Sequence, residues 1–92
     1  MSEPVIHVAY ATARKGGFHA RARAYVLDSG GVRHSRAVCL DDTPELAMSG
    51  AVEFVRDLYR RDGMAAPRHV ESHGRKAGAV VDGLLFGPGG VA

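Results

Sequence analysis

Cationic or aromatic side chains at 19, 21, 23 and 25 are separated by alanines at 20, 22 and 24. Side chains two apart in an extended strand point to the same side and lie about 7 Å from each other. That distance is close to the phosphate spacing of a single nucleic-acid strand, and a tyrosine there could stack on a base. Arginines of the next segment would widen the patch. The predicted binding site comprises His19, Arg21, Arg23 and Tyr25, which we term the basic row, together with Arg33 and Arg36.

The distribution of charge supports this interpretation. The formal net charge is only +2, but residues 14–36 contain six Lys or Arg residues against a single Asp, so the rest of the chain is acidic on balance. Such asymmetry favours an anionic partner at one end of the molecule. Two other interpretations stay open: a solvated sheet face that aids solubility, or a face covered by a partner subunit.

Other residues that could do chemistry are isolated. His69 and His73 lie four apart, a metal-ligand spacing on a helix, but we expect a strand and turn there and interpret them as surface histidines. The chain has no G-x-x-x-x-G-K-[ST] phosphate loop and no serine in a nucleophile-elbow sequence. The lone Cys39 falls in an expected strand, where a buried thiol is more typical than a nucleophile. We therefore predict no catalytic residues, no metal and no cofactor.

The helices and strands that must position these residues are predicted from hydrophobic periodicity and from the turn residues between segments. Alternating segments at 5–13, 18–27 and 32–40 are separated by paired glycines, which are typical of tight turns. The alanine face of the second segment would let a helix approach closely. A helix is expected over 43–62, capped by Asp42 or Thr43, with Pro44 in its first turn and Gly63 after its end. A short fourth strand is expected at 69–72.

The apolar residues of this helix recur at helical spacing. We expect the stripe to pack against the alanine face of the second strand through Leu46, Phe54, Val55 and Leu58. The fold class is therefore predicted as α+β: a three-stranded antiparallel meander, one main helix, and the short fourth strand beside the first.

Length and composition indicate the number of domains and the cellular location. Hydrophobic residues make up 46% of the 92 residues, enough for one small folded domain, which we place at 1–86. Residues 77–86 are apolar but broken by glycines, so either a helix or a strand fits them, and 87–92 are expected to form a flexible Gly/Pro-rich tail. One cysteine permits no internal disulfide, and neither a signal peptide nor a membrane-spanning run is present. A cytoplasmic location is expected.

The β-β-β-α-β order resembles the first part of the RNase H-like fold, over roughly 5–84. The stretch Asp42-Thr43-Pro44-Glu45-Leu46-Ala47 is similar to the start of that family's first helix, and Glu71-Ser72 stands where its fourth strand ends in Asp-Ser. The resemblance implies that Glu45 occupies the position of a catalytic glutamate. The first-strand aspartate is missing, because residues 10–12 are Tyr, Ala and Thr. Two-metal cleavage needs several carboxylates, so the resemblance implies the scaffold, and we predict no nuclease activity.

The expected function is a non-catalytic small binding protein that contacts nucleic acid or an acidic protein surface through its basic sheet face. One alternative is a phage or mobile-element protein that inhibits a host complex by protein–protein interaction. A second alternative is a remnant RNase H-like metal nuclease using Glu45 and Glu71. A homodimer would be compatible with the first two, and no membrane partner is expected.

Overall fold

The computed structural model describes residues 4–13, 19–28 and 31–76, and within them it leaves the side chains at 13, 19, 27, 28 and 31–36 undescribed. The expectations for 77–86 and for the tail at 87–92 lie outside these residues. The described elements follow the predicted order: β1 (Val5–Ala13), β2 (His19–Asp28), β3 (Gly31–Asp41), α1 (Pro44–Arg61) and β4 (His69–Arg75). The predicted α+β class is confirmed.

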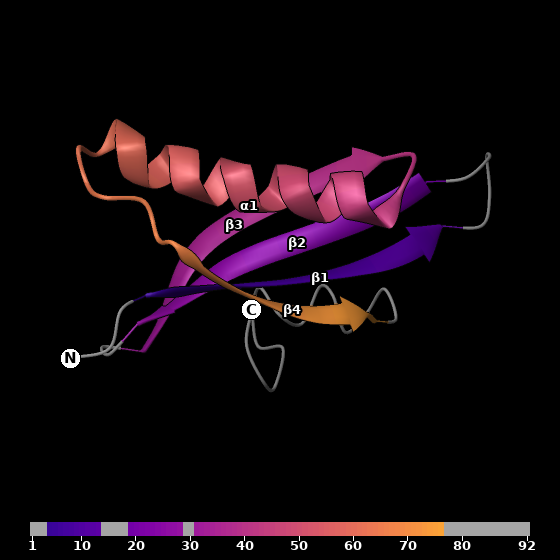
Figure 1. The fold of residues 1–92 in the computed structure, drawn as a ribbon, viewed down its shortest axis with the longest axis horizontal. Helices are drawn as coiled ribbons and strands as arrows, with labels where there is room; N and C mark the ends of the chain where they lie inside the picture. The colour runs from indigo at the N-terminus through magenta and orange to yellow at the C-terminus, as the bar shows by residue number, and fades with distance from the viewer. Residues whose placement is uncertain (1–3, 14–18, 29–30, 77–92) are drawn as a thin grey trace.

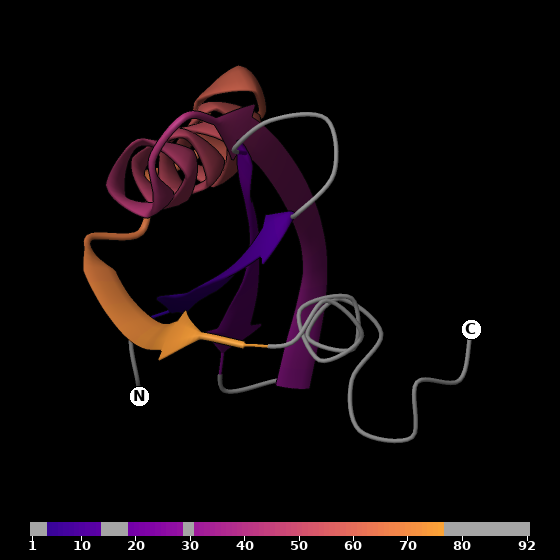
Figure 2. The same cartoon turned by 90° about the vertical axis from the view of Figure 1, so that its right-hand side faces the viewer.

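The four strands form one open mixed sheet in the order β3-β2-β1-β4. β1, β2 and β3 make an antiparallel meander, whereas β4 runs parallel to β1 at the far edge. Figure 1 shows α1 crossing one face of the meander, with β4 beside β1. The view at 90° shows the two layers, with the helix on one side of a twisted sheet (Figure 2).

Small residues set the distance between these layers. The alanine face of β2 points at the helix, as predicted, and its side chains are fully buried together with Ile6 of β1 and Val55 of α1. Gly50 of α1 lies so close to Cys39 of β3 that a methyl group on Gly50 would overlap the Cys39 sulfur. Close approach of helix and sheet therefore depends on residues with little or no side chain.

The predicted helical stripe is largely wrong. Val55 is fully buried, but Leu46, Phe54 and Leu58 are 55%, 52% and 38% exposed. The helix is rotated so that a different set of residues faces the sheet: Ala47, Ala51, Val52, Val55 and Tyr59. The physical reason is close approach: Ala47 and Ala51 lie in the same buried cluster as the alanines of β2, and the Gly50–Cys39 contact leaves no space there for a larger side chain.

Both ends of α1 are closed by hydrogen bonds. Thr43 is the N-cap, and its hydroxyl accepts a bond from the Leu46 amide at 3.2 Å, as one of the two predicted caps. At the other end, Gly63 adopts a positive φ of 73°. The amides of Gly63 and Met64 bond back to the carbonyls of Arg60 and Tyr59, the pattern of a Schellman motif.

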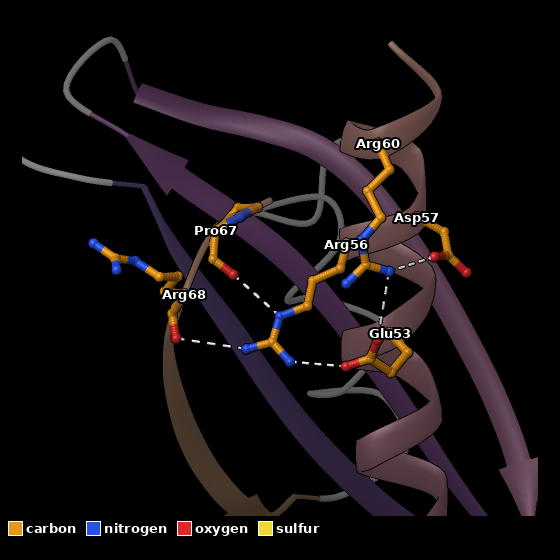
Figure 3. Close-up of polar contacts among 6 residues, drawn as sticks. All are labelled: Glu53, Arg56, Asp57, Arg60, Pro67 and Arg68. Carbon is orange, nitrogen blue, oxygen red and sulfur yellow. Dashed lines mark hydrogen bonds and ion pairs between the residues drawn. The ribbon is translucent and has the colours of Figure 1, made fainter. Parts of the chain in front are cut away.

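The connector from α1 to β4 is attached to the helix by Arg56. Its guanidinium donates to the carbonyl oxygens of Pro67 and Arg68, at 3.1 and 3.5 Å, and pairs with Glu53 at 2.8 Å (Figure 3). These bonds hold the start of β4 against the helix. Within the described residues, no helix has both the length and the apolar character needed to cross a membrane.

Candidate metal centre and the basic row

Three side chains that could ligate a metal ion converge on the sheet face away from α1. The Nδ1 atom of His7 lies 2.8 Å from Nε2 of His73 and 3.1 Å from Oε1 of Glu71. The third side of this triangle, from His73 Nε2 to Glu71 Oε1, is 3.7 Å. We term these three residues the His-Glu-His cluster.

The parallel pairing of β1 with β4 builds the cluster. His7 is directly opposite Glu71 in the register, so both side chains leave the sheet on the same face. Beyond them the register shifts, because β1 advances two residues from Val8 to its next partner while β4 advances three. This bulge contains Gly74 at a φ of 70°, a conformation that favours glycine. It brings the ring of His73 to the Nδ1 edge of His7.

Neighbouring rings fix the orientation of His7. Its imidazole stacks on Tyr25 of β2, with centroids 5.2 Å apart and an interplanar angle of 18°, and meets His73 of β4 edge to edge, with centroids 5.1 Å apart and an angle of 21°. Tyr25 is also the register partner of His7. Burial lowers the pKa of His7, against the opposing influence of Glu71, and so favours a neutral ring with a lone pair. Burial, with Glu71 in second place, raises the pKa of Tyr25 and keeps its phenol protonated.

One proton between the two imidazole nitrogens leaves one nitrogen lone pair beside the Glu71 carboxylate. The 2.8 Å contact between Nδ1 of His7 and Nε2 of His73 holds one proton, so one of these nitrogens presents a lone pair to its neighbours. If His73 donates to His7, the Nδ1 lone pair of His7 faces the Glu71 carboxylate at 3.1 Å. If His7 donates instead, the Nε2 lone pair of His73 and the carboxylate face each other at 3.7 Å. A cation between the three atoms would satisfy them together.

The size of the triangle suits a small cation. Its three sides define a circle with a radius of about 1.9 Å through the ligand atoms, slightly less than the roughly 2.0–2.2 Å of zinc–nitrogen and zinc–carboxylate bonds. An ion at bonding distance from all three would therefore stand just out of their plane. Two imidazoles and one carboxylate are a ligand set found in zinc and non-haem iron sites.

The cluster is accessible from one side. The His7 side chain is 10% exposed, that of His73 is 31% exposed, and that of Glu71 is 61% exposed. A bound ion would be anchored on the buried His7 nitrogen and could take further ligands from the Glu71 side. Among the described residues, this is the group of His, Cys, Asp and Glu side chains whose ligand atoms come close enough to share an ion.

The residues of the basic row are arranged as the strand alternation predicts, but not as an open surface. Arg21, Arg23 and Tyr25 lie on the face away from α1 and are each half-buried. In the register Arg21 and Arg23 stand opposite Ala11 and Ala9, both of which are buried. The Nε atom of Arg23 is itself buried.

The other predicted site residues lie on the same sheet, but their side chains fall outside the described part of the structure. His19 opens β2, and Arg33 and Arg36 lie on β3. The structure therefore brings Arg21, Arg23 and Tyr25 together. The contribution of Arg33 and Arg36 of β3 to the same basic patch stays a prediction.

Sequence reasoning missed the cluster because it paired the wrong histidines. His69 is four residues from His73 but is exposed at the start of β4, and the partners of His73 are His7 and Glu71. One signal was available: a fourth strand beside the first was expected, and a parallel pairing of 5–13 with 69–72 sets His7 opposite Glu71. Glu45 lies exposed in the first turn of α1, whereas Glu71 faces away from that helix.

Comparison of the chain with protein-family models, with curated proteins and with solved structures gives no match. The resemblance to the RNase H-like fold therefore stays a prediction.

Proposed function

We propose that this protein is a small metal-binding protein that holds a divalent transition-metal ion, of which zinc is the best probe, on its His-Glu-His cluster. The single observation that carries the proposal is the convergence of His7 Nδ1, His73 Nε2 and Glu71 Oε1 within 3.7 Å of one another. The nitrogen-rich ligand set favours zinc-like ions over magnesium and calcium, which prefer oxygen ligands.

The bound ion would join the edge strand to the rest of the sheet. β4 is exposed along most of its length, and two ligands come from β4 while the third comes from the buried interior of β1. Three protein ligands leave a further position open for water or an exogenous donor. The protein contributes a buried, ring-stacked first ligand in His7 and a solvent-facing carboxylate in Glu71.

The test is a zinc titration of the chelator-treated wild-type protein and of single-residue variants. Calorimetry, or competition with a chromophoric chelator, measures the zinc affinity of each. Loss of a partner that merely orients a ligand typically weakens metal affinity about 10–100-fold, so His73→Ala and Glu71→Gln should weaken it at least tenfold. His69→Ala is the matched control, because His69 is exposed on the same strand and outside the cluster. A cobalt-substituted sample should show the absorption bands of a low-coordinate site.

The outcome that contradicts the proposal is specific. Zinc affinity equal in wild type, His73→Ala and Glu71→Gln would show that binding occurs elsewhere, for example at the chain terminus. Circular dichroism of each variant separates loss of the ligand from loss of the fold.

A second candidate function is the contact with nucleic acid or an acidic protein surface expected from the basic row. The observation in its favour is that Arg21, Arg23 and Tyr25 share the sheet face of the His-Glu-His cluster, so a bound cation would add positive charge beside them. A cytoplasmic location, where the Cys39 thiol stays reduced, belongs to this candidate.

Titration with a short single strand and with a duplex at two salt concentrations tests this candidate. Affinity should fall steeply with salt, with a log–log slope of about −0.7 per single-strand phosphate neutralised. An Arg21→Ala/Arg23→Ala double variant should bind all sequences more weakly, because phosphate contacts carry no base information. If wild type binds neither polymer at low salt, an acidic protein partner replaces nucleic acid in this candidate.

A further inference from the structure

The helix carries a row of large apolar side chains that the core does not use. Leu46, Phe54 and Leu58 are 55%, 52% and 38% exposed, and Phe54 and Leu58 lie on the flank of α1 nearest β3. Between this flank and the strand runs a groove of about 330 Å³, lined by Ala37, Val38, Phe54, Asp57, Leu58 and Arg61. The opposite flank of α1 is directed toward β4, where Arg56 binds the connector.

The strand beside this groove has no neighbour on its outer side among the described residues. β3 is the first strand of the order β3-β2-β1-β4, eight of its 11 residues have a register partner on β2, and the register breaks at residues 34–36. On either side of that break, no described strand pairs with the outer edge of β3, so the backbone N–H and C=O groups of residues 31–33 and 37–41 are a template for pairing with another strand. Exposed apolar groups therefore lie next to a strand edge that has no partner among the described strands.

The charges at the rim of the groove are self-complementary. Asp57 and Arg61 lie one helical turn apart and both line the groove. Asp57 presents one carboxylate oxygen to Arg60 at 2.7 Å. In a two-fold arrangement of antiparallel helices, Asp57 of each copy would face Arg61 of the other. A surface that carries both signs in this order favours a second copy of itself over a partner of one charge.

We infer that the β3 edge and the adjoining flank of α1 form the interface of a homodimer, with a two-fold axis near the middle of β3. The two β3 strands pair antiparallel, which extends the sheet across the dimer, and Phe54 and Leu58 of each copy fill the groove between the two helices. This interface lies at the sheet edge opposite β4 and does not involve the His-Glu-His cluster.

The size of this surface agrees with a weak, concentration-dependent dimer. An 18-residue helix is about 27 Å long, and a helix layer on a sheet layer is roughly 20 Å deep. The footprint is thus on the order of 500–600 Å² per copy, near the lower end of specific interfaces at about 600–1,000 Å² per partner.

The test is sedimentation velocity from about 1 µM to about 500 µM, since mass action makes the dimer fraction depend on concentration. A chelator is present throughout, which excludes association through metal. Wild type should move from the 9.7 kDa monomer to twice that mass. Phe54→Asp should weaken the dimer at least tenfold. Val70→Asp is the matched control, because Val70 is 43% exposed on β4 at the far edge of the sheet.

A charge exchange identifies the partner as a second copy. Asp57→Arg and Arg61→Asp should each weaken association, because like charges then meet across the two-fold axis. The double variant Asp57→Arg/Arg61→Asp restores opposite charges at both contacts and should recover most of the wild-type affinity. Wild type that stays monomeric up to the highest concentration overturns the inference, as does a double variant no better than the single ones. The proposed metal site is unaffected by either result.

Discussion

Gly50 is a residue whose lack of a side chain can be tested directly. Alanine normally stabilises a helix by about 0.5–1 kcal/mol relative to glycine. Here the added methyl group would overlap the Cys39 sulfur, and overpacking of a core typically costs about 1–3 kcal/mol. Gly50→Ala should therefore lower the free energy of unfolding, as measured by urea denaturation.

A second substitution shows whether the clash is the cause. Cys39→Ala removes the sulfur, so Gly50→Ala in that background should be neutral or stabilising, in keeping with its helix propensity. Ser49→Ala, at an exposed neighbouring position of α1, is the control for propensity alone. Additive effects of the Gly50 and Cys39 changes would contradict this account of the contact.

The Cys39 thiol also has a pH dependence that follows from its surroundings. Burial, and to a lesser extent the carboxylate of Asp41, raises its pKa above the usual range for cysteine. Because the thiolate is the reactive form, the alkylation rate by iodoacetamide should rise at higher pH in the folded protein than in the urea-unfolded chain. Asp41→Asn should move the profile of the folded protein back toward lower pH. Coincident profiles for folded and unfolded chains would contradict this prediction.

The candidate site itself shows what single-residue reasoning could and could not find. Arg21, Arg23 and Tyr25 were placed on one face correctly, because a period of two in one strand is a local property. The contact of His7 with His73 joins residues 66 apart in sequence. It depends on a parallel pairing and on the bulge at Gly74, and neither the register nor the bulge is visible in the residues of β4 alone.

At the scale of elements, the order of strands and helix followed from the sequence, but the rotation of α1 did not. Turn residues and the N-cap at Thr43 are local sequence signals, and they predict both ends of α1 to within one residue. The apolar residues of that helix form an exposed set, Leu46, Phe54 and Leu58, and a buried set, Ala47, Ala51, Val52, Val55 and Tyr59. Hydrophobic periodicity predicts burial of the first set because its side chains are larger. In the structure, close approach of the helix to the alanine face of β2 buries the second set instead.

This rotation of α1 predicts a large loss of stability for a substitution at Val55 and a small loss at the neighbouring Phe54. Val55 is fully buried, so Val55→Ala should cost about 2 kcal/mol from lost burial and a residual cavity. Phe54 is 52% exposed, so Phe54→Ala should cost less than about 1 kcal/mol rather than the roughly 3–5 kcal/mol of a core phenylalanine. Urea denaturation at low micromolar concentration, where self-association is negligible, gives both values. A larger cost at Phe54 than at Val55 would restore the helix orientation inferred from the sequence.

At the scale of the whole molecule, the two edges of the sheet differ in chemistry. The β3 edge adjoins exposed apolar side chains of α1. The β4 edge carries Glu71 and His73, and its residues are mostly exposed. An edge strand with little apolar burial contributes little hydrophobic stabilisation of its own. Its attachment therefore depends on backbone pairing with β1, on the Arg56 bonds to the connector, and on whatever binds the His-Glu-His cluster.

Zinc should consequently stabilise the whole domain and not only the site. A ligand that binds the folded chain at 100 times its dissociation constant adds about 2.7 kcal/mol, and a domain of this size gains roughly 4–8 °C in Tm per kcal/mol. Saturating zinc should thus raise the Tm of wild type by about 10–20 °C, somewhat less if the unfolded chain also binds zinc. The same zinc concentration should leave the Tm of His73→Ala nearly unchanged and should still raise that of His69→Ala. Calcium, an oxygen-seeking ion of similar charge, should have little effect on any of the three. An equal rise for wild type and His73→Ala would mean that zinc acts away from the cluster, and the link between the metal and the β4 edge would have to be abandoned.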